Sequence, residues 1–270
     1  MNPITLLQNI NHSIKTCPTW ADRWSKLTWL YSDKPFVKPW ITGKHQIHFQ
    51  YASPINQITL SVRDNSGSDA FIFSEVFDHC YYDLHLPFQP ETILDLGANA
   101  GFTAIFFARQ YPSAKIACVE PIPDNVELLR ENLKLNSIQA QVFPSAISIA
   151  DGYLEMELDD KDYGHKVAGI EYGKKLTGNT IQVESLSIPT LLQKLGWSRI
   201  SLLKVDIEGY EAILLKEQCN WLSFVDAICI ECHEGYGEAD LQDLAKKWGF
   251  SSPQLLPGTW WLLLRTKESV

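Results

Sequence analysis

The feature that most constrains the fold is a glycine-rich turn, DLGANAG, at residues 95–101. A short apolar run typical of a strand precedes it, and residues 102–111 after it repeat apolar side chains at helical spacing. Glycines at a strand-to-helix turn let a ligand approach the backbone and point the amino end of the helix at that ligand. The turn therefore predicts an α/β fold with a small-molecule site at the carboxyl end of its first strand.

Strand-like and helix-like segments alternate along most of the remaining chain. The predicted strands are KIACVE (115–120), QAQVFPSAI (139–147), RISLLKVDI (199–207) and DAICIEC (226–232). The predicted helices cover residues 123–136, 210–218 and 239–248. This alternation predicts a doubly wound, Rossmann-like α/β sheet, mostly parallel, with helices on both faces. Two closing strands joined by a tight Pro-Gly turn, near Gln254 and at residues 259–266, predict one antiparallel edge strand.

Two regions stand outside this alternation. Residues 1–90 predict an N-terminal cap, with one or two amphipathic helices that end near residues 35–39, a β-hairpin within 41–62 and a helical or mixed segment at 68–77. Residues 151–190 predict two strands around a glycine- and lysine-containing loop, and a short helix follows at 190–195. We therefore expect a cap at 1–90 that shapes the substrate pocket and a cofactor-binding domain at 91–270.

Charge and cysteine content limit the partners and the compartment. The chain carries 32 acidic and 23 basic side chains, a net charge of -9, and no run of lysine or arginine. A phosphate-backbone binder needs a basic face, so nucleic acid is not expected as a partner. The sequence predicts neither a secretory signal nor a membrane span. Six scattered cysteines, with a lone CXXC at 229–232, suit buried thiols in a reducing cytoplasm.

Two residues indicate which cofactor the turn binds. Asn99 holds the position at which a dinucleotide fold has the glycine that admits a pyrophosphate. The turn is therefore crowded for a diphosphate but open to an amino acid or a nucleoside, which favours S-adenosylmethionine (SAM) over NAD. Glu120 ends the second predicted strand, where a carboxylate can accept hydrogen bonds from both hydroxyls of a ribose. Turn, helix, strand and terminal acid together predict a nucleoside site.

Several blocks of sequence follow one another in a recognisable order: SDAFIFSEVFDHCYYD, LDLGANAGF, VEPIPDNVELLRENLKLN, LLKVDIEGYEAILL and ICIECHE. Together they resemble the FkbM family of SAM-dependent methyltransferases, over roughly residues 60–235. The resemblance implies a class I methyltransferase fold, SAM as the methyl donor, and O-methylation of a sugar, a polyketide or another secondary metabolite. The long Trp-rich N-terminus departs from the family pattern, so the resemblance does not define the methyl acceptor.

The resemblance also implies which residues hold SAM. By their place in the matching motifs they are Asp95, Gly97, Asn99 and Gly101 for the methionine part, Glu120 and Pro121 for the ribose, and Ser145 and Ala146, at the end of the third strand, for the adenine. Tyr82 and Asp69, in the N-terminal block, are candidates for closing the site over SAM. Packing and helix capping are the alternative roles for these two residues.

Methyl transfer from a sulfonium needs an aligned acceptor, removal of a proton and exclusion of water. His233 is the leading general-base candidate, because the ordinary pKa of histidine suits proton abstraction near neutral pH. Asp206 and Glu208 are the other catalytic candidates, expected with Lys204 on one face of a continuing strand. Asp206 is also a candidate to orient the SAM ammonium. The alternatives are a histidine that only bonds at a strand end, and Glu208 in the first turn of the next helix.

The same segment raises the question of a metal ion. Asp206, Glu208, Glu231 and His233 could converge as oxygen and nitrogen ligands for Mg²⁺ or a similar ion. Spacing does not establish such a site, and no metal ligand set is expected.

Three other function classes stay open from the sequence. An N-methyltransferase, or one acting on protein or RNA, would be signalled by an (N/D)PP(Y/F) block where KVDIEG stands. A non-catalytic SAM-fold module would bind a partner through the Trp-rich N-terminus, and Asn99 argues against a dehydrogenase.

Trp20, Trp24 and Trp29 have the near-helical spacing of a core stripe or of an interface, such as a homodimer contact. The preferred hypothesis is a SAM-dependent O-methyltransferase acting on a hydroxyl of a small molecule.

Overall fold

The computed structural model of the chain describes residues 3–32, 34, 37, 46–53, 56–64, 68–159, 164–170 and 178–266. Three predicted features lie wholly or partly outside these residues. They are the end of the N-terminal helices near residues 35–39, the start of the hairpin at 41–45, and much of the loop between the two inserted strands. Within them, no helix is both long enough and apolar enough to cross a membrane.

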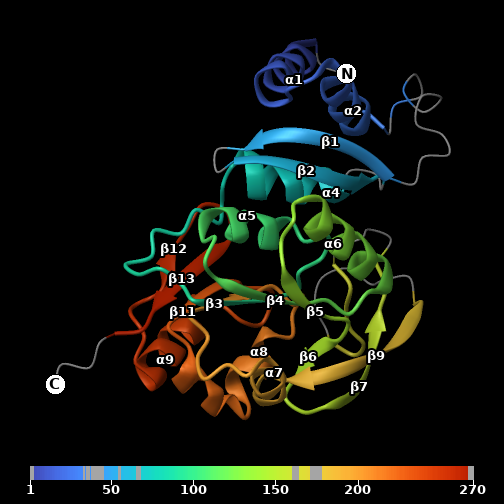
Figure 1. Ribbon diagram of the computed structural model, residues 1–270. Helices are drawn as coiled ribbons and strands as arrows, with labels where there is room; N and C mark the ends of the chain where they lie inside the picture. The colour runs from blue at the N-terminus through green and yellow to red at the C-terminus, as the bar shows by residue number, and fades with distance from the viewer. Residues whose placement is uncertain are drawn as a thin grey trace.

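A seven-stranded sheet forms the centre of the fold (Figure 1). Its strands, in order across the sheet, are β12 (Gln254–Leu255), β13 (Trp260–Leu264), β11 (Ala227–Glu231), β10 (Leu202–Val205), β3 (Thr92–Leu96), β4 (Lys115–Val119) and β5 (Ala140–Phe143). β11, β10, β3, β4 and β5 pair in parallel, and β13 pairs antiparallel with both of its neighbours. The mostly parallel sheet with one antiparallel strand is confirmed, and the two-residue β12 lies beside that strand, at the edge.

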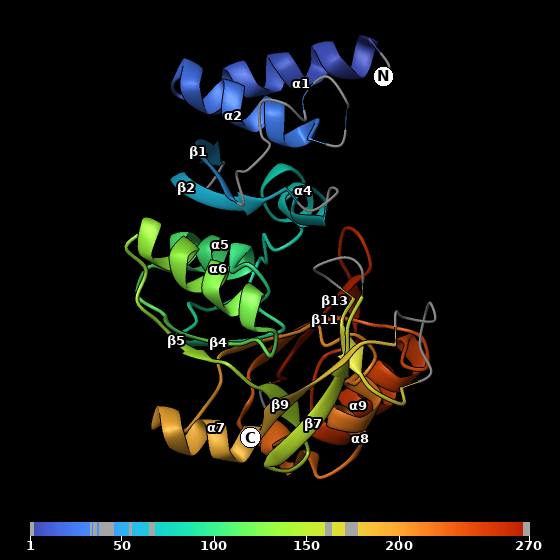
Figure 2. The same ribbon diagram turned by 90° about the vertical axis from the view of Figure 1, so that its right-hand side faces the viewer.

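Helices cover both faces of this sheet (Figures 1 and 2). On one face lie α5 (Phe102–Gln110) and α6 (Pro123–Leu135), and on the other lie α7 (Ile188–Leu195), α8 (Glu211–Lys216), the 3-10 helix η2 (Cys219–Phe224) and α9 (Glu238–Trp248). Local signals set their ends. Pro123 begins α6, and the Ser187 side chain caps α7 by accepting from the backbone N–H of Thr190. The predicted doubly wound arrangement follows from these positions.

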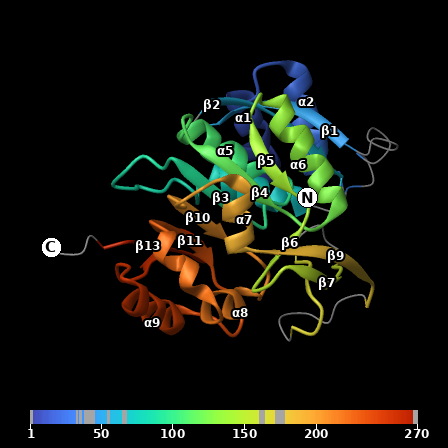
Figure 3. The ribbon, with the colours of Figure 1, turned by 60° about the horizontal axis from the view of Figure 1, so that its bottom comes forward.

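The third predicted strand is divided in the structure. β5 ends at Phe143, Pro144 follows, and β6 (Ala146–Ser148) belongs to a second sheet with the order β6-β9-β7-β8 (Figure 3). Proline has no backbone N–H to donate, so it cannot continue the ladder with β4. The inserted strands predicted within 151–190 are confirmed as β7 (Gly152–Glu157) and β9 (Thr180–Ser187), with the short β8 (Lys166–Val167) between them.

The N-terminal segment adds layers above α5 and α6 (Figure 2). Helices α1 (Pro3–Thr16) and α2 (Trp20–Leu30) lie over the hairpin of β1 (Gln46–Ser53) and β2 (Asn56–Arg63). Helix α4 (Ser68–Phe73) and the π-helical turn η1 (Ser74–Asp78) follow the hairpin. The predicted helices, hairpin and mixed helical segment are confirmed.

The three tryptophans of α2 have different surroundings. Trp29 is 2% exposed, its indole N–H donates to the Arg63 carbonyl at 3.0 Å, and its ring lies 5.4 Å from that of Phe49. Trp20 and Trp24 are 76% and 58% exposed. Trp29 is thus a core residue, while an interface through the other two, such as a homodimer contact, stays a prediction.

A buried asparagine joins the hairpin to the central domain. Asn132 of α6 is fully buried; its Nδ2 donates to the carbonyls of Ser61 at 3.0 Å and Ala100 at 2.9 Å, and its Oδ1 accepts from the Ser61 N–H at 2.7 Å. One hydrophobic cluster also contains residues from both sides of position 90, among them Phe77 and Phe106. The division into segments 1–90 and 91–270 stays a prediction.

We expect Asn132→Ala to lower the free energy of unfolding by about 2–4 kcal/mol, because it leaves three buried backbone groups without partners. Urea unfolding followed by circular dichroism measures this loss. Lys134→Ala, on the exposed side of the same helix, is the matched control and should change the free energy by less than about 0.5 kcal/mol. Equal effects of the two variants would contradict the assigned role of Asn132.

Candidate active site

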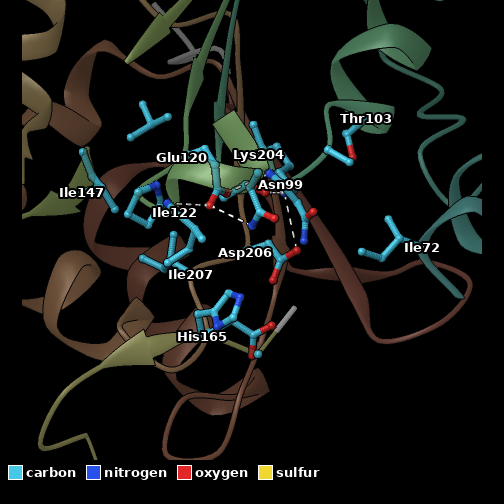
Figure 4. A pocket seen from close by; sticks show the side chains of 18 of the residues that line it. Ile72, Asn99, Thr103, Glu120, Ile122, Ile147, His165, Lys204, Asp206 and Ile207 are labelled. Carbon is cyan, nitrogen blue, oxygen red and sulfur yellow. Dashed lines mark hydrogen bonds and ion pairs between the residues drawn. The ribbon is translucent and has the colours of Figure 1, made fainter. Parts of the chain in front are cut away.

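The carboxyl ends of β3, β4, β10 and β11 surround a pocket (Figure 4). In this view Glu120 and Asn99 lie near the centre with Asp206 below them, and apolar side chains such as Ile147 and Ile72 lie on opposite sides. The place agrees with the general rule that open α/β sheets bind ligands at the carboxyl ends of their strands.

Close packing explains the glycines of the turn after β3. Gly97 has a φ of +77°, and a Cβ atom there would lie 1.8 Å from the backbone oxygen of Asp206. Gly101 has a φ of +83°, and its Cβ would lie 2.4 Å from Leu129 Cδ1 on α6. Gly97 lines the pocket, whereas Gly101 is not among the lining residues and permits helix packing instead. Asn99 adopts a left-handed φ of 46°, which asparagine tolerates better than most residues, and it also lines the pocket.

Glu120 follows β4 and is 4% exposed. Its Oε2 accepts from the backbone N–H of Asn99 at 2.8 Å, and its Oε1 accepts from the N–H of Ile122 at 3.0 Å and from Asn125 Nδ2 at 3.1 Å. Burial raises the pKa of Glu120, and these hydrogen bonds offset part of that rise. Since Oε2 receives one donor from the described residues, it keeps lone pairs with which a ribose hydroxyl can bond.

Ser145 and Ala146 line the same pocket together with Ile147 and Pro121. Ala146 begins β6 and Ser145 directly precedes it. The sequence had predicted both residues at the end of a single third strand. The hydroxyl of Ser145 is buried and has no hydrogen-bond partner among the described residues. A buried hydroxyl without a partner needs an explanation, and a polar ligand atom in the pocket supplies one. The surroundings fit a flat, apolar group with polar edges, such as adenine.

The Lys204 side chain contacts several of the groups that form the floor of the pocket. It is 2% exposed, and its Nζ lies 3.2 Å from Asp95 Oδ1 and 3.5 Å from Asp206 Oδ2. The same ammonium donates to the carbonyls of Gly97 at 2.7 Å and Leu96 at 3.3 Å. Burial alone lowers the pKa of Lys204, but the two carboxylates outweigh burial and raise it. Asp95 is fully buried and is not among the lining residues, so its place is that of a counter-ion and its predicted contact with SAM stays a prediction.

Asp206, Glu208 and His233 come together beyond the strands. β10 ends at Val205, so Asp206 and Glu208 lie in a loop and not on a continuing strand as predicted, and Glu208 precedes α8. His233 Nε2 lies 3.5 Å from Glu208 Oε2 and 4.0 Å from Asp206 Oδ1. His233 Nδ1 lies 3.0 Å from Oε1 of Glu211, which is fully buried. Asp206 and Glu208 line the pocket, while His233 is not among the lining residues.

The charges around His233 decide its protonation. Burial lowers its pKa, but the hydrogen bond to Glu211 and the charges of Asp206, Glu211 and Glu208 raise the pKa of His233 to about 10. The hydrogen bond to Glu211 and the charge of Asp206 therefore favour the protonated form of the imidazole. An imidazolium has no free lone pair to take a proton, and the role of His233 as general base stays a prediction.

The same cluster meets the distance requirement for a metal ion. One ligand atom each from Asp206, Glu208 and His233 lie within 4.8 Å of one another. Glu231, the fourth residue considered from the sequence, is not in this group and accepts from Thr259 Oγ1 at 2.5 Å. The expectation of an enzyme without a metal ion stays a prediction.

The two N-terminal candidates differ in position. Tyr82 lines the pocket, and its ring packs 4.7 Å from the ring of Trp260 and 5.8 Å from that of Phe107. Asp69 is fully buried, pairs with Arg63 at 2.7 Å and is not among the lining residues. Asp69 therefore has the packing role, and closure of the site by Tyr82 stays a prediction.

Three residues that the sequence analysis did not assign belong to the site. Lys204 holds its floor, Glu211 fixes Nδ1 of His233, and Glu75 lines the pocket from η1. Each is a charged residue within an apolar segment, namely LLKV, GYEAILL and FIFSEVF. A charge in such a segment signals a buried pair or a site, because isolated charges are costly to bury.

We expect Lys204→Met to lower the free energy of unfolding by about 3–5 kcal/mol, because Asp95 is then buried without its counter-ion. Urea unfolding measures the change. The double variant Asp95→Asn, Lys204→Met removes both charges and should recover part of the loss. If the double variant loses as much stability as the single variants Lys204→Met and Asp95→Asn lose together, the two groups do not interact as described.

Comparison with known proteins agrees with this geometry. The sequence family described as the methyltransferase FkbM domain matches residues 95–250 of this chain. Methyltransferase sdnD of Sordaria araneosa is 32% identical over 209 residues, which are 64% of this chain and 80% of that protein. The 31-O-demethyl-FK506 methyltransferase FkbM of Streptomyces tacrolimicus is 24% identical over 187 residues, 58% of this chain and 72% of that one. Hexuronic acid methyltransferase AglP of Haloferax volcanii is 23% identical over 156 residues, 58% and 62% of the two chains. The chain belongs to the FkbM family of methyltransferases.

Proposed function

We propose that the chain transfers the methyl group of SAM to a hydroxyl group of a small molecule. The observation that carries this proposal is the Glu120 carboxylate, buried beside the glycine turn and held by the backbone N–H groups of Asn99 and Ile122. It supports ribose binding at this place, because a carboxylate at the end of the second strand accepts hydrogen bonds from ribose hydroxyls. Membership of the FkbM family implies that the nucleoside is SAM.

The lining residues suit the three parts of SAM. The unpartnered hydroxyl of Ser145 can bond to the edge of adenine, and Ala146 offers an apolar contact to its face. Gly97 and Asn99 would hold the methionine part, and the Asp206 carboxylate can accept from its ammonium. When bound, SAM supplies an electrophilic methyl group on a positively charged sulfonium.

The charge of the pocket supports a cationic ligand. Besides Glu120, the acids that line it are Glu75, Asp206, Glu208 and Glu231. Lys204 is the lysine among the lining residues, and Asp95 and Asp206 already oppose its charge. Those of these acids that are ionised attract a molecule of net positive charge such as SAM, and a bound sulfonium favours their ionised form in turn.

Two further observations support an oxygen acceptor that is not part of a nucleic acid. One relative is named for 31-O-demethyl-FK506, which supports an oxygen as the acceptor atom, and another is named for a hexuronic acid. In this chain KVDIEG stands where an amino or base methyltransferase has (N/D)PP(Y/F), and the net charge of -9 disfavours a nucleic-acid substrate.

Calorimetric titration with SAM tests the proposal directly. We expect saturable binding by the wild-type chain and an affinity about 100-fold lower for Glu120→Gln, because the amide loses charge-assisted hydrogen bonds to the ribose. Glu127→Gln, on the exposed face of α6, is the control and should bind as the wild type does. A wild-type chain that binds no SAM at millimolar concentration would contradict the proposal.

A further inference from the structure

Glu75 lies in the part of the pocket wall that the N-terminal segment supplies. It belongs to the π-helical turn η1, in which the N–H of His79 donates to the Ser74 carbonyl at 2.8 Å. A π-helical turn contains one residue more than an α-helical turn, and such turns occur frequently at functional sites. Here the turn buries Val76 and Phe77 fully in the core, while Glu75 remains half-buried and lines the pocket.

Glu75 differs from the other pocket acids in its partners. The others each have one within the chain: Glu120 with Asn99, Asp206 with Lys204, Glu208 with His233 and Glu231 with Thr259. From the part of the chain that the structure describes, no hydrogen bond or ion pair reaches the Glu75 carboxylate. The Glu75 oxygens are therefore open to water or to a ligand in the pocket.

We propose that Glu75 is the general base that removes the proton from the acceptor hydroxyl, an inference that rests on the proposed O-methyltransferase function. The proton passes to a Glu75 carboxylate oxygen while the acceptor oxygen forms its bond to the methyl carbon. The carbon–sulfur bond breaks, and its electron pair stays on sulfur to give S-adenosylhomocysteine. Glu75 then returns the proton to solvent.

The groups that face Glu75 make it a suitable base. Burial, followed by the charges of Glu231 and Asp206, raises the pKa of Glu75 to about 7, and Lys204 lowers it in part. Tyr82 lines the same pocket, and burial raises its pKa, so it is neutral in this range. A base is most effective when its pKa lies near the working pH. Glu75 is therefore protonated and inactive as a base well below pH 7, and ionised above it.

A first experiment needs no acceptor. Infrared difference spectra of the whole chain, taken from pH 5 to 9, record the C=O band of protonated carboxyl groups. The wild type should lose a band with a midpoint near pH 7 that Glu75→Gln lacks. Glu91→Gln, at the opposite end of β3 and exposed, should keep it. Identical spectra of the wild type and Glu75→Gln near pH 7 would overturn the assignment.

A second experiment measures S-adenosylhomocysteine release with methyl glycosides, a hexuronic acid and a macrolide alcohol as acceptors. Glu75→Gln should lower kcat by about 10²- to 10⁴-fold and remove its rise with pH through about 7, whereas its SAM affinity should fall far less than its rate. Glu75→Asp keeps a carboxylate and should exceed Glu75→Gln in rate, although it departs further in size. A kcat of Glu75→Gln close to that of the wild type would overturn the inference, as would equal losses of rate and SAM affinity in both variants.

The failure of this inference is distinguishable from that of the proposed function. A wild-type chain that neither binds SAM nor methylates any acceptor contradicts the proposed function. A wild-type chain that does both, with Glu75→Gln equally active, contradicts only the role of Glu75. If SAM binds but none of these acceptors is methylated, the infrared titration alone decides.

Discussion

The rest of the site depends on the ion pair between the buried Lys204 ammonium and the Asp95 carboxylate. Fully desolvated, the ammonium can be accommodated only because the Asp95 carboxylate and two carbonyls of the glycine turn surround it. The same ammonium holds Asp206 near the turn, where Gly97 lets the Asp206 carbonyl approach closer than any side chain would permit. One buried charge thus couples β3, β10 and the loop after β10, and fixes the floor on which a ligand rests.

Negative charge is distributed over this floor in two ways. Glu120 is held by backbone donors and His233 offsets several carboxylates beyond β10 and β11, so these groups are fixed in place before any ligand binds. Glu75, which comes from the N-terminal segment, lacks such a partner among the described residues. The cap therefore contributes chemistry as well as shape to a site that the central sheet builds, in line with the hydrophobic cluster the two parts share.

Much of this was predictable from sequence, because it depends on local patterns. Alternating strands and helices, the turn at 95–101 and Glu120 at a strand end each have a local signature. The remainder depends on tertiary contacts. Lys204 lies opposite Asp95 only in the register of β10 with β3, and the protonation of His233 depends on Glu211, 22 residues away. Pro144 carried a local signal for the break after β5, whereas the early end of β10 at Val205 had none.

A crystal structure of the chain with S-adenosylhomocysteine would show how a nucleoside lies in the pocket. We expect the ribose hydroxyls to lie within hydrogen-bond distance of Glu120, the adenine to lie beside Ser145, and the sulfur to lie in the part of the pocket that Glu75 and Asp206 line. A nucleoside bound elsewhere, or a Glu120 side chain that makes no contact with the ribose, would contradict this expectation.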